Sequence, residues 1–125
     1  MSISLPKTFD LITEKWSPHL LATVNDQHVK IAKIDGSFVF HSHPETDELF
    51  YLLSGKLTMK FEDRPDVEMV AGDVCVVPKG VRHCPVADDA QIMMVEAAGT
   101  VNTGDAPKSD RTRTLLDASS LSSQN

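Results

Sequence analysis

The spacing of hydrophobic residues changes near residue 19. Before that point the hydrophobic positions recur every three or four residues, as on one face of an α-helix: Leu5, Phe9, Ile12 and Trp16. Pro6 is compatible with the first turn of such a helix, and Pro18 ends it. The sequence therefore predicts a short N-terminal helix over residues 5–16 that lies against the rest of the protein.

Beyond residue 19, short hydrophobic runs are separated by turn residues every eight to twelve positions, a pattern typical of an all-β sandwich or barrel. Residues 56–61 alternate strictly, with Leu57, Met59 and Phe61 on one face. The runs 49–53 and 74–77 are hydrophobic at every position. We expect such strands to be covered on both faces, by a second layer of sheet or by a second subunit.

Hydrophobic residues become sparse after residue 104. Apart from Leu115 and Leu116, we expect little of the segment 105–125 to pack, because it is rich in Ser, Thr and charged residues. We interpret 1–104 as one domain that includes the helix, and 105–125 as a flexible C-terminal tail. A chain of 125 residues has room for one domain with its own core.

The charge balance narrows the classes of partner. Eighteen acidic residues against twelve basic ones give a net charge of −6, and the basic residues are scattered. Nucleic acids and anionic membranes bind clustered Lys and Arg, so we expect neither as a partner. The sequence shows no signal-peptide pattern and no long apolar run, from which we expect a cytoplasmic location.

Three of the five histidines occur in related contexts. His41 and His43 are two residues apart, so in a strand both side chains project from the same face. Glu48 follows a polar, turn-like segment that can fold the chain back beside them. His83 follows a turn at Pro78–Gly80 that returns the chain toward the same interior. We therefore expect these four side chains to converge.

Three imidazoles and one carboxylate suit a divalent transition metal such as Fe, Mn, Ni, Co, Cu or Zn. Such a set leaves two positions of an octahedral ion open, as catalysis requires. The His-x-His pair alone is a weak motif, since two histidines near acidic residues often bind nothing. Glu48 and His83 in matching contexts strengthen the metal interpretation, whereas we expect His19 and His28 to be structural or on the surface.

Strand alternation extends the predicted interior. Val39 should face inward with the histidines, and Phe38 and Phe40 outward. Phe50 and Leu52 should face inward with Glu48, and Val76 should line the floor. A largely apolar wall of this kind favours a small, apolar or metal-chelating substrate over a phosphorylated one.

Other chemistries find less support. The sequence contains no phosphate-binding glycine loop, nucleophile elbow or HExxH motif. A Cys84–His83 thiol mechanism is disfavoured because adjacent strand residues point to opposite faces.

Two stretches resemble the conserved motifs of the cupin superfamily. Gly36-x4-His41-x-His43-x4-Glu48-x6-Gly55 resembles the first motif, G-x5-H-x-H-x(3,4)-E-x6-G, with one residue fewer after the first glycine. Gly72-x5-Pro78-x-Gly80-x2-His83 resembles the second, G-x5-P-x-G-x2-H-x3-N, with Ala87 in place of the final Asn. The resemblance covers about residues 28–97 and keeps all four ligand positions.

The resemblance implies a cupin double-stranded β-helix, that is, a jelly-roll barrel with the short N-terminal helix beside it. It implies a metal held inside by His41, His43, Glu48 and His83, and a homodimer. Residues 96–105 are also similar to small single-domain cupins described as mannose-6-phosphate-isomerase-like, a label that reflects sequence similarity more than activity.

Three function hypotheses follow. The first is a metal-dependent enzyme acting on a small molecule, either a dioxygenase-type oxygenase or an isomerase. The second is a non-catalytic module that binds or senses a small molecule or metal. The third, a metal-free or storage-type structural protein, is disfavoured because all four ligand types are present. The fold alone does not choose among them, because one barrel supports many chemistries.

Overall fold

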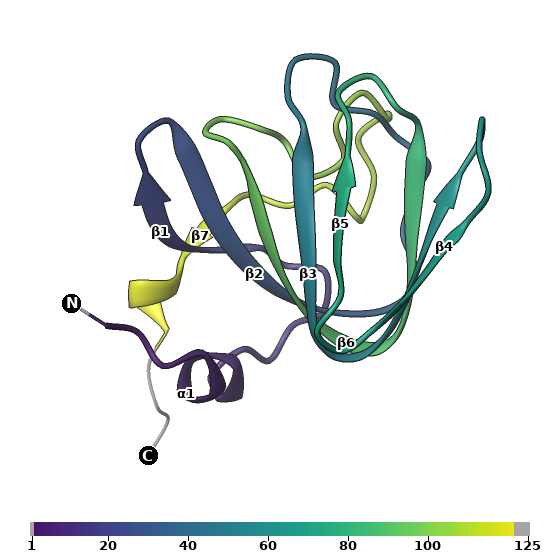
Figure 1. Ribbon diagram of the computed structural model, residues 1–125. Coiled ribbons are helices and arrows are strands. Elements are labelled where there is room, and N and C mark those ends of the chain that lie inside the picture. The colour runs from purple at the N-terminus through teal and green to yellow at the C-terminus, as the bar shows by residue number, and fades with distance from the viewer. Residues whose placement is uncertain (1, 122–125) are drawn as a thin grey trace.

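The short hydrophobic runs of the sequence form seven β-strands, which the computed structural model describes together with one short helix over residues 2–121 (Figure 1). The elements are α1 (Leu5–Asp10), β1 (His19–Val24), β2 (Gln27–Ser37), β3 (Glu48–Phe61), β4 (Val67–Val70), β5 (Val74–Val77), β6 (His83–Ala97), β7 (Leu116–Asp117) and the 3-10 turn η1 (Ala118–Ser120). No helix in this part of the chain has the length and apolar character needed to cross a membrane.

The strands follow the order β4-β3-β6-β2-β1-β7, and β5 pairs with β3 beside β4. β3 and β6 pair over nearly their whole lengths, with register shifts on both sides of Ser54 where both strands bend. Gly55 lies at this bend with a φ of +81°, and a Cβ on it would lie 2.3 Å from the Asp89 carbonyl oxygen. Only glycine therefore allows the two strands to fold over together at this point. The resulting all-β jelly roll confirms the predicted fold class.

The interior of the barrel is filled by the inward positions of the long strands, which alternate with outward ones. The largest buried cluster includes Leu52, Leu57 and Met59 of β3 and Ile92 of β6, each 3% exposed or less. The predicted alternation in residues 56–61 is confirmed, since Leu57 and Met59 are buried whereas Lys56 and Lys60 are exposed. This cluster holds the strands that carry the site described below.

The helix α1 is shorter than predicted and ends at Asp10 rather than continuing to Trp16. Trp16 instead donates its backbone N–H to Lys33 O at 2.8 Å and its indole N–H to Asp35 O at 2.9 Å. These bonds attach the chain to β2, and the φ of Trp16 is +61°, which an α-helix does not allow. Pairing with the sheet therefore overrides the helical spacing of residues 11–16.

α1 covers the outer face of the sheet. Phe9 and the following Ile12 pack with Ile31 of β2, and Leu53 and Met93 lie at the margin of the same cluster. Figure 1 shows the helix beneath the strands. The helix thus stabilises the sheet from outside and takes no part in the interior.

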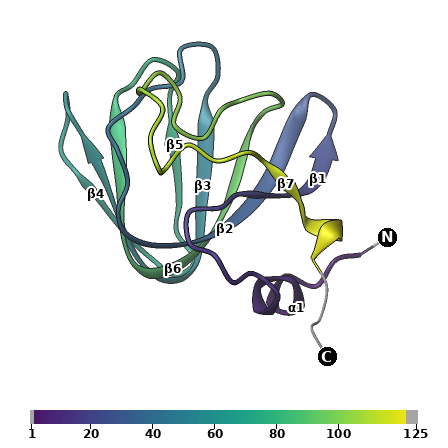
Figure 2. The same cartoon turned by 180° about the vertical axis from the view of Figure 1, so that it is seen from behind.

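Residues 105–121, predicted as part of a flexible tail, make polar contacts with the barrel, although none of them is buried. Figure 2 shows this segment crossing the barrel before it reaches β7, which pairs in parallel with β1. Polar contacts hold it: Thr103 and Thr112 share a hydrogen bond of 3.0 Å, and Asn102 donates to Arg111 O at 2.6 Å. A hydrophobicity pattern does not reveal such contacts. Residues 122–125 of the predicted tail lie outside the described residues.

Candidate metal centre

The sequence brings its two histidine-bearing stretches together through backbone hydrogen bonds. His41 and His83 exchange N–H···O bonds of 2.9 Å in both directions, as an isolated antiparallel bridge. Gly80 donates its N–H to His43 O at 2.9 Å, which places the Pro78–Gly80 turn beside the His-x-His segment. Glu48 begins β3 opposite both. Segments separated by about forty residues in the chain therefore supply one cluster.

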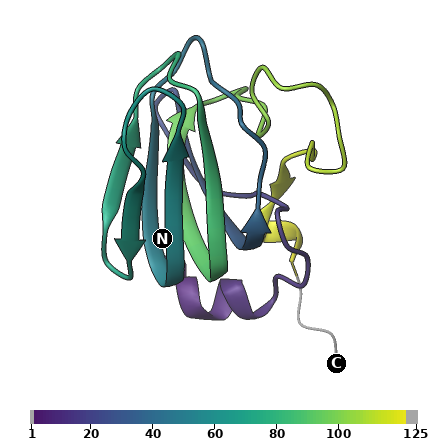
Figure 3. The same cartoon turned by 90° about the vertical axis from the view of Figure 1, so that its right-hand side faces the viewer.

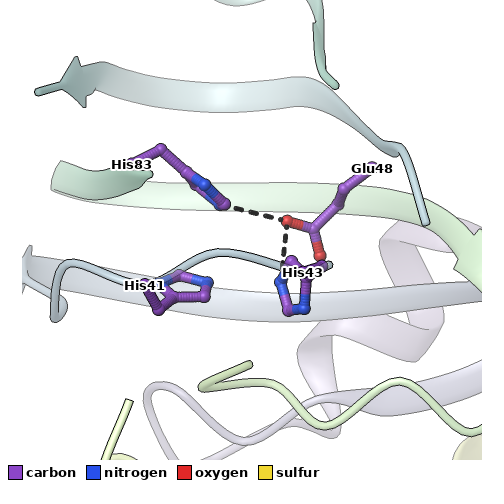
Figure 4. Close-up of side chains that lie close together, drawn as sticks. All are labelled: His41, His43, Glu48 and His83. Carbon is purple, nitrogen blue, oxygen red and sulfur yellow. Dashed lines mark ion pairs between the residues drawn. The ribbon is translucent and has the colours of Figure 1, made fainter. Parts of the chain in front are cut away.

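The four side chains converge as the spacing predicts (Figure 4). One potential ligand atom from each of His41, His43, Glu48 and His83 lies within 4.8 Å of the others. The Nε2 atoms of His43 and His83 lie 3.5 and 3.4 Å from Glu48 Oε1. All four residues are 4% exposed or less. The cluster is thus closed to bulk solvent and compact enough to surround a single ion.

Backbone carbonyls fix two of the imidazole rings. Nδ1 of His41 lies 2.8 Å from Val39 O, and Nδ1 of His83 lies 2.9 Å from Val81 O. A carbonyl oxygen only accepts hydrogen bonds, so each Nδ1 carries the proton and each Nε2 keeps its lone pair. Histidine ligands of metals are oriented in the same way by their other nitrogen.

Three of the converging atoms have no hydrogen-bond partner within residues 2–121: His43 Nε2, Glu48 Oε1 and His83 Nε2. Buried polar atoms are nearly always paired, and leaving one unpaired costs about 1–3 kcal/mol. One cation among the three would satisfy all of them. The donor set, imidazole nitrogen with one carboxylate, suits a divalent transition metal. The residues present therefore fit the ion that the sequence predicts.

The electrostatics favour the ligating protonation states. Burial, together with the neighbouring His83, lowers the pKa of His41 to about 4, so this ring is neutral at physiological pH. Burial acts to raise the pKa of Glu48, but the side chains of Glu96, His43 and His83 outweigh it and hold the pKa well below its ordinary value. Neutral imidazole and ionised carboxylate are the forms that bind metals.

The C-terminal segment braces the His-x-His stretch. The carboxylate of Asp105 accepts hydrogen bonds from the backbone N–H of Ser42 at 2.7 Å and from its hydroxyl at 2.8 Å. Gly104 packs so closely that a Cβ on it would lie 2.2 Å from Ser42 O and 3.1 Å from the His41 ring. Residue 42 lies between two of the candidate ligands, so the position of this segment and that of the cluster are linked.

A cavity of about 580 Å³ opens beside the cluster, with His41 and Glu48 in its wall. This volume is within the range of small-molecule sites. Trp16, Phe38 and Phe50 supply aromatic surface, and ten of the 24 lining residues come from residues 99–115. Figure 3 shows that the C-terminal segment lies on the side of the molecule away from β3, β4 and β5. The cavity is therefore enclosed by the sheet on one side and by this segment on the other.

Two expectations about the wall are wrong. Phe38 was predicted to face outward, but it lines the cavity and stacks on Trp16 with ring centroids 4.8 Å apart. β2 ends at Ser37, so strand alternation does not continue through residues 38–40. Val76 was predicted to line the floor, but its side chain is 53% exposed because β5 turns that position outward. Phe50 and Leu52 are buried in the interior as predicted.

Sequence reasoning missed a second group of polar residues in the cavity wall, which we call the polar cluster: His28, Lys30 and Glu96. His28 was predicted to be structural or on the surface, yet it lines the cavity. Lys30 and Glu96 are each 2% exposed and form an ion pair of 2.8 Å. Burial and the neighbouring Glu48 raise the pKa of Glu96 to about 9, against the effect of Lys30. The alternation of inward and outward positions over residues 28–34, and along β6, is the sequence signal that could have identified these three residues.

His19, the two acidic residues just before Glu48 and the two cysteines lie apart from the cavity. His19 is buried, with Nδ1 3.0 Å from Ser17 O, in keeping with the structural role predicted for it. Asp47 accepts a hydrogen bond from the backbone N–H of Lys79 at 2.9 Å, and Glu45 is exposed. Cys75 and Cys84 are both free thiols.

Comparisons with known proteins point to one family. The family model described as cupin domain matches residues 27–96, which carry the strands and the four converging residues. Among curated proteins, the uncharacterised protein YdbB of Bacillus subtilis (strain 168) is 36% identical over 72 residues, which are 58% of this chain and 64% of that protein. The match thus spans less than two thirds of that relative's length.

Solved structures agree with the family match. A cupin-2 domain containing protein from Shewanella frigidimarina NCIMB 400 is 37% identical, with a TM-score of 0.70 over 75% of this chain and 91% of that one. The hydroquinone 1,2-dioxygenase PnpCD, solved in complex with Fe³⁺, is 24% identical, with a TM-score of 0.70 over 82% of this chain and 34% of that one. The second similarity shows a common fold alone. By its motifs, its barrel and these matches, the chain belongs to the cupin family.

Proposed function

We propose that this cupin is a metal-dependent enzyme acting on a small molecule, with His41, His43, Glu48 and His83 as the ligands of one divalent transition metal. The observation that carries the proposal is the convergence of three unpartnered, buried ligand atoms beside a cavity large enough for a substrate. A purely structural ion needs no cavity, and an empty cavity needs no such cluster. Their coincidence favours catalysis at the ion.

A bound ion would supply a Lewis acid or a site for dioxygen, because four protein ligands leave coordination positions open. The chain's own aromatic residues would exclude water from the substrate, and His41 and Glu48 would face it from the wall. The oxygenase branch is supported by the shared fold with a dioxygenase that binds Fe³⁺. The isomerase branch is supported by the Lewis-acid character of such an ion, since the mannose-6-phosphate-isomerase-like label reflects sequence similarity more than activity.

Elemental analysis of protein purified without added metal tests the first step. We expect about one equivalent of a transition metal per chain, and less than about a tenth of an equivalent contradicts the proposal. Oxygen uptake with catechols, thiols and small diketones, after iron is restored, tests the oxygenase branch. If no compound is turned over but one raises the melting temperature, the protein is a non-catalytic small-molecule binding module instead.

A homodimer is part of the proposal. The sequence predicts that the run 74–77 is covered on both faces, yet within one chain Val74 and Val76 are 58% and 53% exposed. Val67 and Val70 on the neighbouring strand β4 are also exposed, and this β4–β5 row lies at the edge of the sheet. A second copy packed here would cover both the valines and the edge. Light scattering should give about twice 13.7 kDa, and Val74→Lys should give the monomer; a monomeric parent protein contradicts this.

We also place the protein in the cytoplasm. Its two free cysteines favour a reducing compartment. Fractionation of the source cells checks this, and recovery outside the cytoplasmic fraction contradicts it.

A further inference from the structure

The cavity wall changes character along the barrel. The register of β3, β6 and β2 places Glu48, Glu96 and His28 in one row across the inner face. The next row contains Phe50, Met94 and Lys30, and the row after that Leu52, Ile92 and Ala32. On the sheet side of the cavity, the polar side chains are therefore gathered next to the candidate metal centre, and the rows beyond them are hydrocarbon. The opposite wall, supplied by the C-terminal segment, adds further polar residues such as Asn102, Lys108 and Arg113.

The polar cluster has hydrogen-bonding capacity that the described part of the chain does not use. Lys30 Nζ donates to Glu96 Oε1 at 2.8 Å and to Thr100 O at 3.2 Å, which occupies two of its three N–H groups. Glu96 Oε2 and His28 Nδ1 are buried and have no hydrogen-bond partner. All three residues line the cavity. Such unused capacity inside a protein calls for a bound group that both accepts and donates.

From this juxtaposition we propose that the polar cluster is a hydroxyl-binding subsite, and that the ligand presents an alcohol or phenol hydroxyl to it and an apolar surface to the rest of the sheet. The hydroxyl oxygen accepts a hydrogen bond from Lys30, and the hydroxyl shares a second hydrogen bond with Glu96 Oε2, as donor or acceptor. His28 Nδ1 lies across the strand register from Glu96 and offers a further contact. The inference rests on the proposed function in one respect, namely that this cavity is the substrate site.

Other polar groups match the subsite less well. A carboxylate accepts but cannot donate, and it would lie close to the ionised carboxylate of Glu48. An ammonium group donates but cannot accept, and it would lie against Lys30. A hydroxyl also accepts from Glu96 when that carboxyl is protonated, so its match does not depend on the charge of Glu96. The apolar rows beyond the cluster favour hydrocarbon on the side of the ligand that faces the sheet.

The competing explanation is that the Lys30–Glu96 pair only positions Glu48, its cross-strand neighbour. A positioning role predicts that substitutions alter metal binding and leave the choice between ligands unchanged. A binding role predicts that the same substitutions alter the choice between ligands and leave metal binding unchanged. Ligand preference is therefore the measurement that separates them.

The test compares three probes of similar size on the purified full-length protein, whose metal content is measured first. Cyclohexanol carries the hydroxyl, methoxycyclohexane lacks its donor, and cyclohexanecarboxylate replaces it with an acceptor-only anion. We expect calorimetric titration to show cyclohexanol binding at least about tenfold more tightly than either of the others. Trp16, the single tryptophan, lines the cavity and gives an independent fluorescence signal for the same titrations.

The double variant Lys30→Met/Glu96→Leu removes the polar groups of both residues together, because breaking a buried pair on one side alone is strongly destabilising. In this variant we expect the preference for cyclohexanol to fall to within about twofold. Lys33→Met is the matched control, since Lys33 Nζ donates to Ile12 O rather than facing the cavity, and it should keep the preference.

Equal binding of the three probes to the parent protein overturns the inference, and that comparison needs no variant to fold. An unchanged preference in the double variant also overturns it. A preference for cyclohexanol in protein that is purified with less than about a tenth of an equivalent of metal supports the subsite and contradicts the proposed function. Bound metal and substrate turnover without a preference for cyclohexanol support the proposed function and overturn the subsite.

Discussion

The two ends of the barrel interior differ in whether their buried groups have suitable neighbours. At one end, Leu52, Leu57 and Ile92 are 3% exposed or less and need only hydrocarbon neighbours, which they have. At the other end lie the four candidate ligands and the polar cluster, with five buried polar atoms unpartnered in the described chain. Both ends are built on the same strands, so the fold does not impose the difference.

The comparison indicates which end stabilises the protein. Burial of apolar surface contributes about 25 cal/mol per Å², whereas unpartnered polar groups oppose folding. The apolar end therefore holds the polar end in a conformation that it would not keep alone. If this division is correct, substitutions at one end change mainly stability, and substitutions at the other change mainly metal binding.

The largest effect should come from the apolar end. Leu52→Ala removes a side chain that is 0% exposed, and we expect the free energy of unfolding to fall by about 4 kcal/mol in chemical denaturation. Metal content per folded chain should stay the same. Val24→Ala, at a position 55% exposed, is the control and should change stability by less than about 0.5 kcal/mol. Loss of metal from folded Leu52→Ala protein would contradict the division.

The next effect should come from the candidate ligands. His43→Ala should weaken metal binding by about a hundredfold, or about 2.7 kcal/mol, and lower the melting temperature of metal-loaded protein. His28→Ala removes a histidine from the same cavity but from outside the four-residue cluster, so it should keep the metal and the melting temperature. Metal content by elemental analysis and thermal denaturation check both. Equal metal content in the two variants would refute the ligand assignment.

A smaller effect should come from the contact between the C-terminal segment and the His-x-His stretch. Gly104→Ala places a Cβ 2.2 Å from Ser42 O, so we expect about 2 kcal/mol of destabilisation and about tenfold weaker metal binding. Gly99→Ala is the matched control, because it shares a positive φ, here +87°, but has no atom within 4 Å of the added Cβ. It should cost about 1 kcal/mol from backbone strain alone and leave metal affinity unchanged. Equal losses of stability and of metal affinity in the two variants would show that the contact between Gly104 and Ser42 does not affect the candidate metal centre.

The smallest effect should depend on pH. Hydrogen bonds from the Ser42 backbone and hydroxyl lower the pKa of Asp105, so its ionised form stabilises the folded state. This contribution is fully present above the unfolded-state pKa of about 3.9 and is lost as the pH falls through the lower folded-state value. Asp105→Asn should therefore cost less than about 1 kcal/mol at pH 7, because the group is exposed, and nothing near pH 2. Asp110→Asn is the control, and a pH-independent difference for Asp105→Asn would contradict the account.

The part of the site that could be predicted from the sequence depends on local spacing. His41 and His43 share a face because they are two residues apart, and turns at fixed distances bring Glu48 and His83 to them. The all-β fold follows from the same regular alternation, and it is confirmed. The assignment of these four residues as metal ligands stays a proposal.

The part that could not be predicted depends on long-range contacts between irregular segments. Phe38 lies beyond the end of β2, where alternation no longer applies. The segment after residue 104 is held by hydrogen bonds such as Asp105 to Ser42, which leave no hydrophobic pattern. Lys30 and Glu96 lie 66 positions apart, and each looks like an ordinary charged strand residue until the register of β2 and β6 pairs them.

The family match ends at residue 96, while ten of the 24 residues around the cavity come from residues 99–115. The candidate metal centre and one wall of the cavity are thus encoded in separate stretches of the chain. Insertions or substitutions in the later stretch can reshape that wall while the four candidate ligands are unchanged. Relatives with the same core can in this way bind different ligands. We expect their substrates to vary with the sequence of residues 99–115 more closely than with overall sequence identity.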